Sequence, residues 1–157
     1  MLRYLFLPIS FLLLLTACSD GLTGQAGGKA HAPAKWERMV CESCDLANAN
    51  LNGAILYKSD LTGATLTGAN LSGADLSGAD LSGADLSKAI LTGAILYKTD
   101  LTRANLKSAD LTKADLTKAD LTGVNLKGAN MAGANLYGVI GADFTGALNV
   151  PELYLKD

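Results

Sequence analysis

Residues 74–88 read Ala-Asp-Leu-Ser-Gly-Ala-Asp-Leu-Ser-Gly-Ala-Asp-Leu-Ser-Lys, which is one five-residue unit written three times. The register of this unit extends from Asp45 to Leu136. Every fifth position from 46 to 136 is leucine, apart from Met131. Two positions before each of these, alanine is the usual residue, and the exceptions are Cys44, Ser59, Thr99 and Val124. A period this strict predicts a repeat architecture.

A period of five fits neither an α-helix nor a continuous β-strand. Leucines five apart on a helix would be offset by roughly 140° and would form no apolar stripe. In a strand, an odd period would place successive leucines on opposite faces. The pattern fits a chain in which each pentad forms a short extended segment and then a corner. The alanine and the leucine would point inward, the residue between them outward, and the last two residues would turn the chain.

A chain that turns the same way after every short segment winds into a solenoid with leucine and alanine inside. The repeated Ala-(Asp/Asn)-Leu-x-Gly units resemble those of the bacterial pentapeptide-repeat family. This resemblance covers roughly residues 39–138 and implies an all-β fold, a right-handed four-sided parallel β-helix with twenty residues per coil. The pentads from Cys41 to Leu136 would give about five coils, stacked over ~24 Å. Members of the family have several roles, so the resemblance predicts the fold far better than the function.

The N-terminus has the features of a bacterial lipoprotein signal. One positive charge precedes residues 4–15, which are apolar apart from Ser10. The tetrad Leu15-Thr16-Ala17-Cys18 resembles the lipobox, which implies a signal peptide of residues 1–17 and lipid attachment at Cys18. Ser19 favours the outer membrane, facing the periplasm, in a Gram-negative cell. The alternative is a plain secretory signal in which the cysteine occurs by chance.

The segments that flank the repeat have predicted roles of their own. Residues 18–35 are rich in glycine and poor in apolar residues, which predicts a flexible tether. His31, the only histidine, lies in this tether, where we expect a solvated side chain. Open solenoid ends need caps. We therefore expect residues 36–40 to form an N-terminal cap in which Trp36 and Met39 cover the first coil.

A change of register marks the far end of the solenoid, which we place at residues 41–138. Gly141 stands where an apolar residue is expected, and the pattern resumes three residues out of phase with Phe144. An apolar tail follows, and Asn149 before a proline is a start signal for a short helix. Residues 139–157 are therefore predicted to form a C-terminal cap. The alternative is a homodimer contact, as in some members of the family.

Cys41 and Cys44 form a Cys-x-x-Cys pair where the repeat begins. They occupy a leucine and an alanine position, so both should face inward. In an oxidising compartment such a pair can close as a disulfide with a structural role. Redox function is the alternative, but the sequence lacks the βαβ context of a thioredoxin. It also lacks the His of a c-type haem motif and the second cysteine pair of a zinc site.

Folding the repeat into twenty-residue coils brings four carboxylates into one outward column, ~4.8 Å apart. These are Asp60, Asp80, Asp100 and Asp120. Their mutual repulsion predicts raised pKa values unless a base lies between them, and Arg103 is the clearest nearby base. The column is a weak candidate for a divalent-cation site or for contact with a basic partner. The alternative is that aspartate is simply the usual outward residue of the repeat.

A second outward column has a period of forty residues. Ile55-Leu56-Tyr57-Lys58 recurs as Ile95-Leu96-Tyr97-Lys98, and Tyr137 follows after another forty. We expect the three tyrosines to line one face at ~10 Å intervals, with Ile55 and Ile95 pointing outward beside them. Exposed Ile and Tyr side chains in a row suggest a contact with a partner. The alternative is a residual duplication of forty residues without a binding role.

The sequence predicts a non-enzymatic protein without a cofactor, because no hydrolase or nucleotide-binding motif is present. The leading hypothesis is a lipid-anchored solenoid of the cell envelope that presents a face to a protein or a glycan. The alternative is a purely structural or self-associating envelope protein. Some cytoplasmic family members protect DNA gyrase by mimicking DNA. Residues 41–157, however, carry nine Lys/Arg against thirteen Asp/Glu, far below the charge density of DNA. Export also argues against this role, which we keep as a remote alternative, and we expect no nucleic-acid partner.

Overall fold

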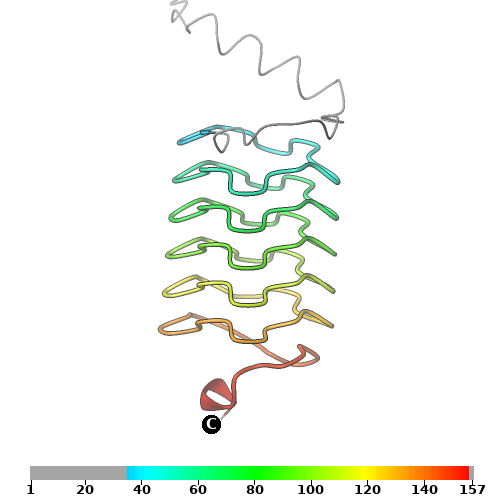
Figure 1. The fold of residues 1–157 in the computed structure, drawn as a ribbon, viewed down its shortest axis with the longest axis vertical. Helices are drawn as coiled ribbons and strands as arrows, with labels where there is room; N and C mark the ends of the chain where they lie inside the picture. Colours follow the sequence, from blue (N-terminus) through cyan, green and yellow to red (C-terminus); the bar gives the residue numbers. More distant parts are fainter. Residues whose placement is uncertain (1–34, 156–157) are drawn as a thin grey trace, which may run out of the picture.

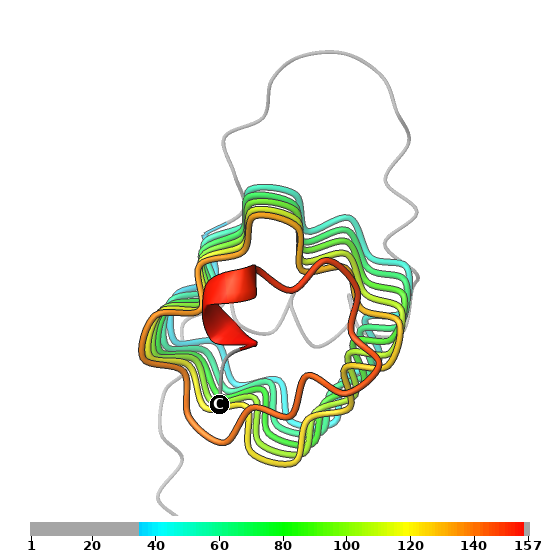
Figure 2. The ribbon, with the colours of Figure 1, turned by 90° about the horizontal axis from the view of Figure 1, so that it is seen from below.

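The computed structural model describes residues 35–155. Short parallel bridges between residues twenty apart stack residues 35–140 into a coil (Figure 1). The first bridge joins Lys35 to Ile55, and the regular series ends with Asp120 and Ile140. Seen along its axis, the coil has four sides that superimpose from turn to turn (Figure 2). The expected four-sided parallel β-helix is therefore confirmed. The predicted signal peptide, Cys18 and His31 lie outside the described residues.

The same small set of backbone hydrogen bonds ties each pentad into the coil. The N–H of Leu76 donates to the carbonyl of Ile95 at 2.8 Å, and the N–H of Gly78 donates to the carbonyl of Tyr97 at 2.9 Å. The N–H of Ala79 donates back to the carbonyl of Leu76 at 3.0 Å and closes a four-residue turn. Neighbouring coils and corner turns therefore satisfy the backbone groups, although no long strand forms.

The third residue of the corner turns has a positive φ, which is the mark of a type II turn. Glycine often holds this place, as at Gly73 with a φ of 63°. Other corners hold a longer residue in the same conformation, such as Lys88 with a φ of 59°. The left-handed region costs a residue with a Cβ roughly 1–2 kcal/mol, so the corners without glycine are strained.

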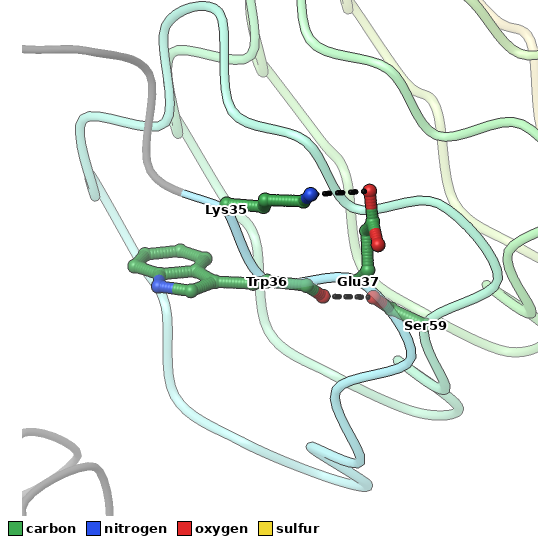
Figure 3. A network of polar contacts seen from close by, with 4 residues as sticks. All are labelled: Lys35, Trp36, Glu37 and Ser59. Carbon is green, nitrogen blue, oxygen red and sulfur yellow. Dashed lines mark hydrogen bonds and ion pairs between the residues drawn. The ribbon is translucent and has the colours of Figure 1, made fainter. Parts of the chain in front are cut away.

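Leucine and alanine ladders fill the interior, and Leu76 and its equivalents in neighbouring coils are fully buried. Within residues 35–155, the buried polar side chains are Ser59 and Thr99. Each hydroxyl donates to a carbonyl of the preceding coil. Ser59 Oγ bonds the carbonyl of Trp36 at 2.8 Å (Figure 3). Thr99 Oγ1 bonds the carbonyl of Leu76 at 2.8 Å. These bonds explain how the alanine ladder admits two hydroxyl groups.

The bridge ladder begins before the position at which the sequence analysis placed the solenoid. The bridge between Val40 and Asp60 makes residues 36–40, expected to be a separate cap, one side of the first coil. Trp36 and Met39 do pack against the core, as expected. They do so at the leucine and alanine positions of this side. The sequence missed this side because neither residue is the usual one for its position.

The repeat changes register near Gly141, as expected. The last bridge joins Asn130 to Leu148, eighteen residues apart instead of twenty. Gly141 has a φ of 63°, and a Cβ at this position would lie 2.9 Å from the Cα of Thr122. Glycine is therefore required where the chain shortens its path and crosses closely over the preceding coil.

The segment after the register change packs against the end of the core. Phe144, Val150 and Tyr154 are partly buried against it. The 3₁₀ helix η1, Glu152–Tyr154, which follows Pro151, is the one helix within residues 35–155 and lies at the end of the coil (Figures 1 and 2). This packing is that of the expected cap, and the expected short helix is present.

The corner strain yields a pair of opposite predictions. Lys88→Gly should raise the free energy of unfolding by roughly 0.5–1 kcal/mol, because it removes strain. Gly73→Ala should lower it by about the same amount. A Cβ at Gly73 would meet nothing within 4 Å, so its effect reports the backbone alone. Denaturant midpoints followed by circular dichroism measure both changes. Shifts in the same direction would contradict the strain argument.

Candidate interaction surface

The four aspartates of the first column stack as expected. Parallel bridges join them in the order Asp60, Asp80, Asp100 and Asp120. In each, Oδ1 accepts a hydrogen bond from the backbone N–H two residues further on, at 2.8–3.1 Å. This is an Asx turn, so each carboxylate stabilises its own corner. Within residues 35–155, no group of three or more His, Cys, Asp or Glu is placed to hold a metal ion.

The raised pKa values expected in this column are wrong for two of its members. The hydroxyl of Thr62, and then its backbone N–H, donate to Asp60 and hold the pKa of that carboxyl below its usual range. Thr122 lowers the pKa of Asp120 in the same way. Hydrogen bonds to the charged form favour it. The sequence analysis counted the repulsion between coils and omitted these donors within each corner.

On a second side of the coil, two side-chain amides stack above the carboxylate of Asp85. Asn105 Nδ2 donates to Asp85 Oδ1 at 3.0 Å, and Asn125 Nδ2 donates to Asn105 Oδ1 at 3.0 Å. Burial raises the pKa of Asp85, but hydrogen bonds from the backbone and from neighbouring side chains outweigh it and leave a lowered pKa. The hydroxyl of Thr112 is the largest cause of the lowered pKa of Asp110. Both carboxylates are therefore favoured in the charged form.

Cys41 and Cys44 are joined by a disulfide of 2.03 Å, with Cα atoms 5.3 Å apart. Cys41 is buried at a leucine position, and Cys44 is half-buried at the alanine position of the same corner. The bond therefore spans the first and fourth residues of one turn. This arrangement is that of a local staple at the start of the coil.

The three tyrosines occupy one corner of the coil, on alternate turns. The N–H of Lys58 bonds the carbonyl of Ser77, and the N–H of Gly78 bonds that of Tyr97, so Tyr57 and Tyr97 lie two coils apart. Two strand spacings correspond to ~9.6 Å. Tyr137 lies two coils further on and is the most exposed of the three, at 67% against 37% for Tyr57 and 36% for Tyr97.

Two lysines that the sequence analysis did not assign to this surface lie against its aromatic rings. Lys58 Nζ is 5.2 Å from the ring centroid of Tyr57, and Lys98 Nζ is 5.3 Å from that of Tyr97. These are cation–π distances. The repeated Tyr-Lys dipeptide was the available signal. We call the surface formed by these corners the tyrosine edge, and its residues are Ile55, Tyr57, Lys58, Ile95, Tyr97, Lys98 and Tyr137.

Buried hydroxyls anchor the two Tyr-Lys corners of the tyrosine edge. Ser59 and Thr99 follow the two lysines directly, and they make the cross-coil bonds to Trp36 and Leu76 described above. Alanine stands at the equivalent position, Ala79, of the coil between them. An extra cross-coil hydrogen bond, worth about 1 kcal/mol net, therefore accompanies each Tyr-Lys pair. Of the two isoleucines, Ile95 is 41% exposed and Ile55 is half-buried.

Comparison with known proteins gives a consistent match. The family model described as pentapeptide repeats matches residues 44–83, 69–107 and 104–148. No curated protein sequence matches the chain significantly. Solved structures of pentapeptide-repeat proteins, which are right-handed four-sided β-helices, resemble it.

Three of these structures illustrate the range of similarity. HetL from the cyanobacterium Nostoc sp. strain PCC 7120, involved in heterocyst differentiation regulation, is 34% identical over 75% of this chain, with a TM-score of 0.47. The match spans 61% of HetL. The protein alr5209 from Nostoc PCC 7120 is 33% identical over 75% of this chain and 98% of its own, with a TM-score of 0.53. QnrB1, a plasmid-mediated fluoroquinolone resistance protein, is 22% identical over 73% of this chain and 74% of its own, with a TM-score of 0.48. This last likeness concerns the fold alone.

The lowered carboxylate pKa values predict a loss of stability in acid. A carboxyl whose pKa is lower in the folded chain stabilises the fold above its unfolded pKa of ~3.9. That contribution disappears as the pH falls through the lower folded value. We expect a denaturation midpoint that is constant above about pH 5 and falls below about pH 4. The variant Asp85→Asn/Asp110→Asn keeps acceptor oxygens for the corners and should show a shallower fall. A midpoint that increases in acid would contradict the prediction.

Proposed function

Because the chain belongs to the pentapeptide-repeat family, whose members are generally non-enzymatic repeat proteins, we propose that it is a lipid-anchored solenoid of the cell envelope. In this proposal its tyrosine edge binds a protein or glycan partner. The observation that carries the proposal is the placement of Tyr57, Tyr97 and Tyr137 on one corner, with the exposed Ile95 and two lysines beside them. Tyrosine is favoured at binding surfaces because it offers a large apolar face and a polar tip.

The rigidity of the surface supports this assignment. The tyrosines project from corners that the backbone ladder fixes, and the hydroxyls of Ser59 and Thr99 add a further tie at two of them. A tyrosine on a fixed backbone loses only two side-chain torsions on binding, so the entropic cost of contact is small. A preorganised surface of this kind suits binding rather than turnover of a substrate.

The anchor in this proposal is Cys18. The motif Leu15-Thr16-Ala17-Cys18 resembles the lipobox, and several acyl chains on one residue would give stable attachment. Ser19 directs the protein to the outer membrane, facing the periplasm, in a Gram-negative cell. Within residues 35–155, no helix is long and apolar enough to cross a membrane.

Self-association through the C-terminal end is a second candidate function. The cap buries one set of apolar side chains but leaves another set exposed, namely Leu148 at 53%, Leu153 at 76% and Leu155 at 58%. Such a patch favours an apolar contact. DNA mimicry remains a remote alternative, since the likeness to QnrB1 concerns the fold alone and the acidic residues outnumber the basic ones only modestly.

Crosslinking in intact cells tests the role of the tyrosine edge. We expect the triple variant Tyr57→Ser/Tyr97→Ser/Tyr137→Ser to lose the crosslinked species that the native protein forms. Serine is the natural residue at the equivalent corner position 77, so the fold should tolerate these changes. Ile90→Asp is the matched control, because it removes an exposed apolar group from another side. Unchanged crosslinks in the tyrosine variant would refute the assignment.

Metabolic labelling with a fatty-acid analogue tests the anchor. The native protein should incorporate the label, and Cys18→Ser should not, because the thiol that accepts the lipid is removed. The variant Cys41→Leu/Cys44→Ala, which restores the usual residues of the repeat, should still be labelled. Equal labelling of Cys18→Ser and the native protein would rule out this attachment site.

A further inference from the structure

The tyrosine edge has a regular spacing that restricts the kind of partner it fits. Tyr57 and Tyr97 lie two coils apart, or ~9.6 Å, and a lysine ammonium group lies 5.2–5.3 Å from each ring. Aromatic faces and positive charges therefore recur together with the same period. A partner that uses both corners must itself repeat an apolar face and a negative charge at this spacing.

From this spacing we infer that the tyrosine edge binds a linear β-1,4-linked glycan that carries a free carboxylate on every second sugar, as the glycan strands of bacterial cell walls do once their stem peptides are removed. Successive sugars in such a chain are turned over, so the same ring face recurs on every second sugar, over about the length of two coils. The inference rests on the proposed binding role of this surface and names the chemistry of the partner.

The chemistry of each corner matches one repeat of such a glycan. The C–H face of a sugar ring can stack on the exposed apolar face of a tyrosine. The adjacent lysine then supplies an ammonium group to the carboxylate on the same sugar, and such charge-assisted contacts are stronger than neutral ones. Asp60 and Asp100, which follow the corners by two residues, already accept hydrogen bonds from their own turns.

The affinity for the glycan arises because two binding corners are held at a fixed spacing. One tyrosine and one lysine form a weak site, but two such sites on a fixed rod engage one glycan chain together, and the second contact is intramolecular. Tyr137 offers a third ring on the same line, with Gly138 in place of the lysine. We therefore expect affinity to rise steeply between the disaccharide, which reaches one corner, and the tetrasaccharide, which reaches two. A preference for an extended anionic surface, such as a lipid membrane, predicts no such rise in affinity between the disaccharide and the tetrasaccharide.

Co-sedimentation and calorimetry with purified peptidoglycan strands, freed of their stem peptides, test the inference. We expect the native protein to bind, and Tyr57→Ser/Tyr97→Ser to bind about tenfold or more weakly. Lys58→Gly/Lys98→Gly should also weaken binding to these strands, while binding to uncharged chitin oligosaccharides changes little. Both lysines have a φ of 55°, so the glycine variants relieve strain and a loss of binding does not reflect unfolding. Lys88→Gly/Lys113→Gly removes two charges from other corners and should bind as the native protein does.

The outcomes separate the glycan from other occupants of the surface. Failure to bind peptidoglycan, equal binding by the tyrosine variant, or equal affinity for the disaccharide and the tetrasaccharide would overturn the inference. Preferential binding to vesicles of phosphatidylglycerol, or self-association that the tyrosine variant abolishes, would also overturn it. If the tyrosine variant loses its cellular crosslinks while peptidoglycan does not bind, the glycan inference fails and the proposed function stands. If the crosslinks are unchanged as well, both fail.

Discussion

The rest of this structure depends on the hydrogen bond that the N–H of an inward-facing leucine donates to a carbonyl of the next coil. In the bond from Leu76 to Ile95, donor and acceptor are nineteen residues apart, and the same interval recurs along the regular part of the coil. Because the interval is constant, residues at equivalent positions stack directly upon each other. Leucine then meets leucine inside the coil, and each outward side chain meets its equivalents at ~4.8 Å. The effect of any substitution therefore depends on the equivalent side chains in the coils directly above and below it.

Stacked like charges are the main liability of this arrangement, and the chain handles them in two ways. In the column of Asp60 and Asp120, donors within the same corner stabilise the carboxylates. On another side, the amides of Asn105 and Asn125 continue the column above Asp85 and form a chain of side-chain hydrogen bonds. Aspartate and asparagine can therefore exchange along the outward positions without loss of the corner acceptor. The main role of the outward Asp or Asn is to accept the hydrogen bond of its corner, and the charge that it places on the surface is secondary.

The sequence predicts most of the fold because the period of five leaves few solutions. The core ladders, the stacking of the columns, the change of register at Gly141 and the short helix near Pro151 all follow from the order of residues. The first side of the coil was not predicted, because Trp36 and Met39 stand there in place of the usual leucine and alanine. The direction of the aspartate pKa shifts escaped because it depends on hydroxyl rotamers, which the residue pattern does not specify. The lysine contacts escaped because the direction of a long side chain from a corner is a matter of packing.

The forty-residue period of the tyrosine edge needs a cause other than the fold. The backbone requires periods of five and twenty only, and the coil between the two Tyr-Lys corners folds equally well with Ser77 and Gly78. Residues 55–62 and 95–102 differ at one position, where Ser59 is replaced by Thr99, and both keep the buried hydroxyl. A duplication explains why the two segments are alike. Lysine at a positive φ also occurs at Lys88, Lys113 and Lys118, so it is a general feature of the corners. What distinguishes Lys58 and Lys98 is the tyrosine ring against which each lies. In the proposed binding mode both pairs act in one binding event, which gives a reason for both copies to keep the whole pair.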